Sequence, residues 1–155
     1  MLLAIDIGNT NIVCGIYERQ TLRGHWRIAT DFSKTSDEYG ILFQGLLQTS
    51  GIKSEHITGA ILSSVVPSLT TTLEQMVEIY FHQLPLIVSA ELDTGLRLSY
   101  PNPLEIGSDR LVNAAAAYAQ YKTCLIIIDF GTATTFCAVT EAGDYLGGVI
   151  AHGLG

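Results

Sequence analysis

Basic residues are scarce in this sequence, and charged residues of either sign are few. Only 8 Lys and Arg stand against 15 Asp and Glu, which gives a net charge of −7, and charged residues make up 15% of the 155 residues. Without a basic stripe, nucleic acid is not expected as a partner. A phosphate ligand is expected to be held by backbone N–H groups and a metal ion. The low charge and an apolar fraction of 48% favour an α/β fold whose sheet is covered on both faces.

Long apolar runs and paired cysteine motifs are also missing. No stretch approaches the ~18 apolar residues of a membrane span, and Asp6 interrupts the only apolar run near the N-terminus. We therefore expect neither a membrane partner nor a signal peptide. Cys14, Cys124 and Cys137 show no C-x-x-C spacing and lie within apolar runs, which predicts buried free thiols in a reducing compartment. The His residues are scattered, so a zinc site is not expected. These absences indicate a cytoplasmic protein.

The apolar periodicity predicts an α/β element order of βββ-α-β-α-β-α followed by βββ. Short connections make each group of three strands an antiparallel meander. Thr35 and Glu38 have the spacing of a helix capping box, and Pro67 suits the first turn of a helix. The segment 89–107 is expected to be an irregular, functional loop. The expected strands are 2–7, 12–17, 22–29, 59–65, 85–88, 124–128, 134–140 and 145–150, and the expected helices are 36–48, 67–82 and 108–121.

One sequence pattern occurs twice. LLAIDIGNTN begins at residue 2 and LIIIDFGTAT begins at residue 125, and each joins an apolar run to Asp-x-Gly and small polar residues. The matched pairs are Asp6/Asp129, Gly8/Gly131, Cys14/Cys137, Ile16/Val139 and Gly24/Gly147. We therefore predict a duplicated βββαβαβα unit, complete over residues 1–121 and truncated after three strands over residues 122–155.

Each Asp-x-Gly turn has the chemistry of a phosphate site. Gly8 and Gly131 permit a tight turn and the close approach of a ligand. The small polar residues after them offer hydroxyls and backbone N–H groups of the kind that bind phosphate oxygens. If the two units face each other, Asp6 and Asp129 approach across a cleft, where a cation would offset their repulsion. Hydrated Mg²⁺ suits such oxygen ligands.

The segment YPNPLEIGSDR at 100–110 supports two interpretations. In the first, Ser108 caps the following helix and Asp109 interacts favourably with the helix dipole. In the second, the start of the helix faces the cleft, Asp109 accepts a proton from a substrate hydroxyl, and Arg110 binds the substrate or pairs with a carboxylate. Asp is a weak base, but phosphoryl transfer depends mainly on positioning, so a weak base is enough.

These motifs together resemble type III pantothenate kinase, a family in the actin-like (ribonuclease H-like) group of duplicated ATP-binding folds. The resemblance runs from residue 2 to the last residue and keeps the order and spacing of the motifs. It implies ATP-dependent phosphorylation of pantothenate to 4′-phosphopantothenate, the first step toward coenzyme A, by a homodimer. The matching motifs are Asp6-Ile7-Gly8-Asn9-Thr10, Trp26-Arg27, Thr35-x-Asp37-Glu38, Ser63-Ser64-Val65-Val66-Pro67, Tyr100-Pro101-x-Pro103, Gly107-x-Asp109-Arg110, Asp129-x-Gly131-Thr132-Ala133-x-Thr135 and Gly147-Gly148.

The resemblance also implies a role for each matching residue. Asp109 would accept the proton of the substrate hydroxyl, Asp6 would lie near Mg²⁺, and Asp129 would coordinate a monovalent cation, K⁺ or NH₄⁺. Thr132 would serve the second phosphate-binding turn. The first phosphate-binding turn would comprise Asp6, Ile7, Gly8, Asn9, Thr10, Asn11, Ile12 and Val13. The pantothenate pocket would be lined by Tyr100, Gly107, Ser108, Asp109 and Arg110.

The sequence departs from the family pattern at three positions. Ser108 stands where a small apolar residue is usual, Cys137 where Asp is usual, and His152 where Pro is usual. A non-catalytic regulatory relative and another small-molecule kinase of the same fold group therefore remain alternatives.

The second unit is expected to be incomplete, because the family's second half, with its adenosine-binding segment, would follow Gly155. The helices of the first unit are expected to cover both faces of its sheet, whereas those of the second unit are missing. We therefore expect the 155-residue chain alone to be inactive. Its exposed apolar face is expected to include Leu125, Ile127, Phe136 and Ala138.

Overall fold

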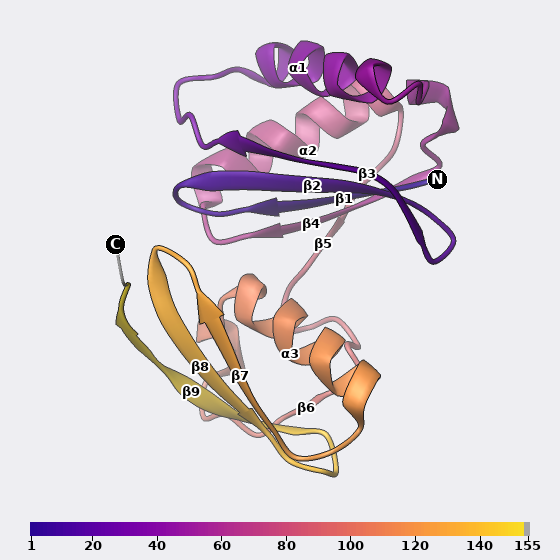
Figure 1. Ribbon diagram of the computed structural model, residues 1–155. Helices are drawn as coiled ribbons and strands as arrows, with labels where there is room; N and C mark the ends of the chain where they lie inside the picture. The colour runs from indigo at the N-terminus through magenta and orange to yellow at the C-terminus, as the bar shows by residue number, and fades with distance from the viewer. Residues whose placement is uncertain (154–155) are drawn as a thin grey trace. The chain divides into compact units, whose positions relative to one another are not determined.

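Contacts in the computed structural model, which describes residues 1–153, divide the chain between Ile87 and Val88 (Figure 1). The helix α3 (Ser108–Tyr121) packs against strands of the second unit. The sequence repeat instead assigns this helix to the first repeat unit, which is predicted to end at Tyr121. That boundary of the repeat remains a prediction. No helix within residues 1–153 has the length and apolar character needed to cross a membrane.

The first unit is built on a five-stranded sheet in the order β3-β2-β1-β4-β5. The first three strands form the predicted antiparallel meander, and β4 and β5 extend the sheet in parallel with β1. Successive residues of a strand face opposite sides of the sheet, so Leu3, Ile5 and Ile7 are buried while Asp6 is exposed on the other face. The strands are β1 (Leu2–Ile7), β2 (Asn11–Glu18), β3 (Thr21–Ala29), β4 (Gly59–Ser64) and β5 (Leu86–Ile87).

Both long helices of the first unit, α1 (Ser36–Thr49) and α2 (Pro67–Phe81), cover the same face of this sheet (Figure 1). The expectation that the helices of the first unit cover both faces of its sheet is therefore wrong for α1 and α2. The predicted capping box is confirmed, because Thr35 Oγ1 accepts the Glu38 N–H at 3.3 Å and Glu38 Oε2 accepts the Thr35 N–H at 2.8 Å. A short 3-10 helix, η1 (Ser54–His56), precedes β4.

One continuous core joins these helices to the sheet. Apolar residues recur every three or four positions along α1 and α2, which places them on one side of each helix. Gly40 lets α1 approach α2, because a Cβ at this position would collide with the ring of Tyr80. The buried side chains of the core include Leu3, Ile5, Ile7, Ile12, Ile16, Tyr39, Phe43, Leu47, Leu62, Leu69, Leu73, Met76 and Val77.

The second unit is built on a four-stranded sheet in the order β6-β9-β8-β7. Its last three strands form the second predicted meander, and β6 pairs in parallel with β9. β6 and a short 3-10 helix, η2 (Pro103–Glu105), lie within the segment expected to be irregular. The strands are β6 (Arg97–Leu98), β7 (Leu125–Phe130), β8 (Ala133–Val139) and β9 (Asp144–His152).

The two meanders are equivalent strand by strand. In the first unit Ile16 pairs with Leu3 on one side and Gly24 on the other, and in the second unit Ala138 pairs in the same way with Ile126 and Gly147. The register shifts directly after Ile16 and directly after Ala138. The duplication therefore extends to the position of a β-bulge.

The register corrects two of the matches made by sliding the sequence on itself. Ile7 pairs with Ile12, whereas Phe130 pairs with Thr134, so the first turn of the second unit is one residue shorter. The matches Ile16/Val139 and Cys14/Cys137 are therefore wrong by one residue. Asp6/Asp129 and Gly24/Gly147 agree with the pairing.

One face of the second sheet is apolar and exposed. Ile126 and Phe130 are each 68% exposed and Val149 is 65% exposed. In register with them, Phe136 and Ala138 lie on this face, as expected, and are half-buried. Through the repeat, this face corresponds to the one that α1 and α2 cover in the first unit.

The expectation for Leu125 and Ile127 was wrong. Both are half-buried on the opposite face, where α3 packs against β7 and β8. Cys124 is exposed, contrary to expectation, because it precedes β7, whereas Cys14 and Cys137 are buried as predicted.

Candidate active site

The first Asp-x-Gly turn is fixed by the residue that follows β3. The Gly8 N–H donates to the Asn11 carbonyl at 3.0 Å and closes the turn. Thr30 Oγ1 donates to the Gly8 carbonyl at 2.6 Å, and the Thr30 N–H donates to the Thr10 carbonyl at 3.0 Å. The backbone of the turn is thereby held in place with Asn9 and Thr10 exposed, and Thr30 is a residue that the sequence did not single out.

The predicted phosphate-binding residues of this turn fall into two groups. The side chains of Ile7 and Ile12 belong to the core, so they do not reach a ligand. Asp6, Asn9 and Thr10 are exposed, whereas Gly8, Asn11 and Val13 are half-buried. The carboxylate oxygens can ligate Mg²⁺, and the amide N–H and the hydroxyl can donate hydrogen bonds to phosphate oxygens.

The second Asp-x-Gly turn closes in a similar way. The Gly131 N–H donates to the Ala133 carbonyl at 3.1 Å, and Thr132 is exposed at the tip. His152 pairs with Ala133 across the β8–β9 ladder. His152, one of the three residues that depart from the family pattern, therefore lies beside this turn.

The start of α3 does not match the capping interpretation of Ser108. Gly107 occupies the N-cap position with no side-chain cap, and Ser108 is the first, buried residue of the helix. The cap prediction was wrong by one residue because Gly107, with φ −58° and ψ 138°, makes the bend. Asp109 Oδ1 accepts the N–H of Arg110 at 2.7 Å, so its carboxylate lies at the positive end of the helix dipole.

Asp129 is held by the same helix. Asn113, one turn after Asp109, donates from Nδ2 to Asp129 Oδ2 at 3.1 Å. Asp129 therefore lies on the face of the sheet that α3 covers, whereas its counterpart Asp6 lies on the face away from α1 and α2. An approach of Asp6 and Asp129 stays a prediction.

Arg110 projects from the first turn of α3 onto β8 and β9. Its Nε donates to the sulfur of Cys137 at 3.3 Å, and Tyr145 Oη donates to the same sulfur at 3.4 Å. A Cβ at Gly148 would lie 2.8 Å from Nη2 of Arg110 and would collide with the carbonyl oxygen of Phe136. The guanidinium therefore crosses β9 where the strand has no side chain.

Tyr100 is positioned by the pairing of β6 with β9. Arg97 Nε donates to Asp144 Oδ1 at 2.7 Å, and the Ser99 N–H donates to the Tyr145 carbonyl at 3.0 Å. The chain then brings the Tyr100 ring to Gly147, where a Cβ would lie 2.6 Å from the ring. Gly147 has a φ of +106°, which also favours glycine. Tyr100 and Arg110 therefore contact neighbouring glycines of one strand.

The donor set fits a lightly coordinated hard cation. Among residues 1–153, no three His, Cys, Asp or Glu side chains are grouped so that they could hold a metal ion. A cation at either turn would thus be held by one carboxylate together with phosphate and water oxygens. Mg²⁺ is commonly bound in this way in sites for nucleotide phosphates.

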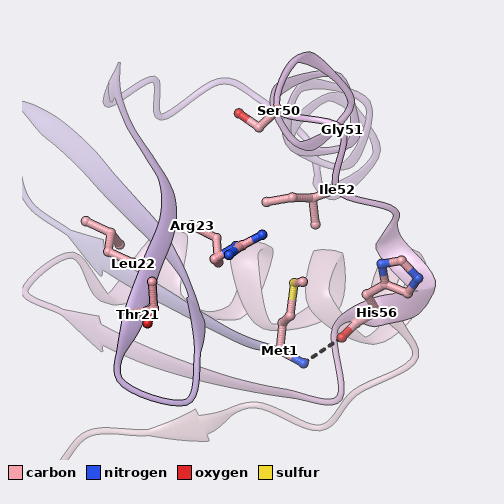
Figure 2. Close-up of a pocket in the computed structure, with 8 residues that line it drawn as sticks. All are labelled: Met1, Thr21, Leu22, Arg23, Ser50, Gly51, Ile52 and His56. Carbon is pink, nitrogen blue, oxygen red and sulfur yellow. Dashed lines mark hydrogen bonds between the residues drawn. The ribbon is translucent and has the colours of Figure 1, made fainter.

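A cavity of about 410 Å³ lies elsewhere in the first unit (Figure 2). Arg23 and His56 line it, and its other lining residues are Met1, Thr21, Leu22, Ser50, Gly51 and Ile52. It lies near the start of β1, whereas Asp6 is near the end of that strand. None of the predicted site residues lines this cavity, so its chemistry is separate from that of the two turns.

Comparison with known proteins gives the family of the chain. The family model for type III pantothenate kinase matches residues 2–155. The chain belongs to the type III pantothenate kinase family. A type III pantothenate kinase of Brevibacillus brevis is 52% identical over 155 residues, which are 100% of this chain and 61% of that relative. The chain thus spans about three-fifths of its relative's length.

Solved structures support the actin-like fold expected for a type III pantothenate kinase. The Ppx/GppA phosphatase of Aquifex aeolicus has a TM-score of 0.54 and 9% identity, covering 97% of this chain and 51% of that one. The ROK hexokinase of Thermus thermophilus has a TM-score of 0.50 and 12% identity, covering 94% and 47%. At such identities the likeness concerns the fold alone.

Within the second unit, the residues of the predicted substrate pocket lie on α3 and on the segment that follows β6. Gly107, Ser108, Asp109 and Arg110 open α3, and Tyr100 and Arg110 meet β9 at adjacent residues. Sequence reasoning missed Asn113, which hydrogen-bonds Asp129, and Tyr145, which hydrogen-bonds Cys137. The only signal for Asn113 was its spacing of one helical turn from Asp109, and no local pattern pointed to Tyr145.

Proposed function

We propose that the full-length protein transfers a phosphoryl group from ATP to the primary hydroxyl of pantothenate. The product is 4′-phosphopantothenate, and the reaction is the first step toward coenzyme A. The family match over residues 2–155 carries this proposal. Because the chain spans 61% of the Brevibacillus brevis relative, the activity is proposed for the full-length protein and not for this chain alone.

The pantothenate half of the site would be formed by the start of α3 and by β6. Asp109 accepts the proton of the primary hydroxyl, whose oxygen attacks the γ-phosphorus of ATP as ADP leaves. Its bond from the Arg110 N–H at 2.7 Å keeps the carboxylate in place at the helix start, and positioning is what this reaction most requires. Arg110 binds the substrate carboxylate, a planar partner suited to a guanidinium, and Tyr100, Gly107 and Ser108 line the pocket.

The ATP half of the site would be formed by the two Asp-x-Gly turns. Asp6 to Val13 bind phosphate oxygens and Asp6 ligates Mg²⁺, while Thr132 serves the second turn. Asp129 coordinates K⁺ or NH₄⁺. The chemistry that these cations supply is neutralisation of the charge on the phosphates. We also propose that the enzyme is a cytoplasmic homodimer.

The test is a phosphorylation assay of the purified full-length protein with ATP, Mg²⁺ and K⁺. We expect ADP release and a product 80 Da heavier than pantothenate, an increment of about one phosphoryl group by mass. A panel of small alcohols, sugars and acids runs beside it. Phosphorylation of another compound in preference to pantothenate would indicate a different kinase of this fold group. ATP binding without any turnover would indicate a non-catalytic relative.

A further inference from the structure

Two hydrogen-bond donors converge on one buried sulfur in the second unit. Cys137 lies in β8 and is 3% exposed. The Nε of Arg110 and the Oη of Tyr145 lie 3.3 and 3.4 Å from its Sγ. Burial raises the pKa of the Tyr145 phenol, so its hydroxyl keeps the proton that it donates. The sulfur is therefore an acceptor for both side chains, one from the start of α3 and one from β9.

The contact holds the guanidinium of Arg110 in one orientation. Its Nε is fixed by the sulfur, and Nη2 lies above Gly148, where a Cβ would be only 2.8 Å away. Tyr145 is a second hydrogen-bond partner of the guanidinium. The Nη edge of a guanidinium has the arrangement that binds a carboxylate through two parallel bonds. A long, flexible side chain is thereby ordered before a ligand arrives, which reduces the entropic cost of binding.

The acceptor also leaves the charge of Arg110 available. Within residues 1–153, Arg110 makes no salt bridge, and its side-chain hydrogen-bond partners are the thiol of Cys137 and the phenol of Tyr145. A carboxylate in place of the thiol would form a charge-assisted bond and compensate the guanidinium. The thiol of Cys137 is a weak acceptor, so it orients the guanidinium while compensating less of its positive charge.

We propose that Cys137, supported by Tyr145, is a positioning residue that presents the Nη edge of Arg110 to the carboxylate of the substrate. This inference rests on the proposed function, because it assigns to that site the part of pantothenate that Arg110 recognises. Cys137 does not touch the substrate and acts through Arg110.

The test compares Cys137→Ala, Cys137→Ser and Tyr145→Phe in the full-length protein. In Cys137→Ala the Nε–H of Arg110 loses its sulfur acceptor. We expect the KM and the Kd for pantothenate to rise about tenfold, because one hydrogen bond of ~1.4 kcal/mol is lost. The kcat and the KM for ATP should change less than about twofold, because the interaction is made equally in the bound ground state and the transition state. Cys137→Ser keeps an acceptor and should recover most of the affinity. Tyr145→Phe, which removes only a hydroxyl, should give a smaller change in the same direction.

Cys14→Ala is the matched control. Cys14 is also buried in the middle strand of a meander, so its replacement removes the same atoms from a comparable environment. We expect lower thermal stability in that variant but an unchanged KM for pantothenate. A rise in KM as large as that of Cys137→Ala would overturn the proposal, because it would then reflect general loosening of the fold.

A second measurement is independent of the substrate. In ¹⁵N-labelled protein, the Nε–H signal of Arg110, identified by its loss in Arg110→Lys, should exchange slowly with water in the wild type and in Cys137→Ser. In Cys137→Ala it should exchange at the rate of an exposed arginine. An unchanged exchange rate in Cys137→Ala would show that the sulfur does not hold Arg110. If the wild type neither binds nor phosphorylates pantothenate, the proposed function fails, and this exchange measurement alone decides the role of Cys137.

Discussion

Asn113 in α3 donates a hydrogen bond to Asp129 in β7, with 3.1 Å between Nδ2 and Oδ2. The bond ties the helix that carries Asp109 in its first turn to the strand that leads into the second Asp-x-Gly turn. Since Asn113 lies one helical turn after Asp109, any movement of α3 along β7 would displace both carboxylates. The proposed proton acceptor and the proposed cation ligand are thus linked through one amide.

The first prediction concerns the cation. Asn113→Ala in the full-length protein should raise the K⁺ concentration for half-maximal activity about three- to tenfold, because Asp129 loses the group that orients it. Activity at saturating K⁺ should be largely restored. The shift should also appear in thermal unfolding measured against K⁺ concentration, which does not depend on turnover. Gln120→Ala, an exposed change later in the same helix, is the control, and an equal K⁺ requirement in both variants would contradict the link.

The second prediction concerns Asp109. Asp109→Asn should lower kcat by roughly 10²–10⁴, the usual contribution of a general base, while the Kd for ATP stays near the wild-type value. The amide oxygen of Asn can still accept the Arg110 N–H, so the helix start should be preserved. Turnover and ATP binding are measured separately by coupled assay and calorimetry. A kcat close to that of the wild type would remove Asp109 from the role of proton acceptor.

Local patterns in this sequence were more informative than long-range ones. The capping box of Thr35 and Glu38 and the start of α2 at Pro67 depend on neighbouring residues, and both were predicted correctly. The strand 125–128 is apolar at every position, so its sequence could not tell which residues face α3. Leu125 and Ile127 were assigned to the wrong face for that reason.

The candidate site was predictable only in part for a related reason. Gly107, Asp109 and Arg110 form a continuous motif, so their proximity followed from the sequence. The contact between Arg110 and Cys137 joins residues far apart in the chain, and it depends on the register of β8 with β9 and on the missing side chain at Gly148. Sliding the sequence on itself did not reveal this contact, because it matched Cys137 one residue away from its true counterpart.

The third prediction concerns pH and stability. Burial raises the pKa of the Cys14 thiol from 9.0 to about 11, against the lowering effect of a hydrogen bond with the backbone of Trp26. Between these two pH values the unfolded chain loses the thiol proton while the folded chain keeps it. The free energy of unfolding should therefore decrease as pH rises from 9 to 11, by roughly 2–3 kcal/mol from this group.

Urea unfolding of the wild type and of Cys14→Ala at several pH values isolates this contribution. The variant should be less stable at pH 8 but should lose less stability between pH 9 and 11, because other titrating groups act equally in both proteins. Parallel pH dependences in the two proteins would rule out a perturbed thiol at this position.

The last prediction concerns the 155-residue chain expressed alone. Its second sheet exposes Ile126, Phe130 and Val149 at 65–68%, on the face whose counterpart in the first unit is covered by α1 and α2. Burying one such side chain contributes roughly 1.5–3 kcal/mol, so several together favour association of this face with another apolar surface. We expect the isolated chain to associate or to be poorly soluble, and to phosphorylate no pantothenate.

A pair of matched variants tests whether this face is the cause. Ile126 and Ile41 are both isoleucines with 68% exposure, one on the apolar face of the second sheet and one on α1. Ile126→Lys should reduce association in sedimentation experiments because it places a charge within the contact, whereas Ile41→Lys should leave association unchanged despite the same change in net charge. Equal effects of the two variants would show that charge alone governs solubility. A soluble 16.7 kDa monomer with turnover near ~1 s⁻¹, the low end for kinases, would show that the face needs no cover and that these 155 residues are sufficient for catalysis.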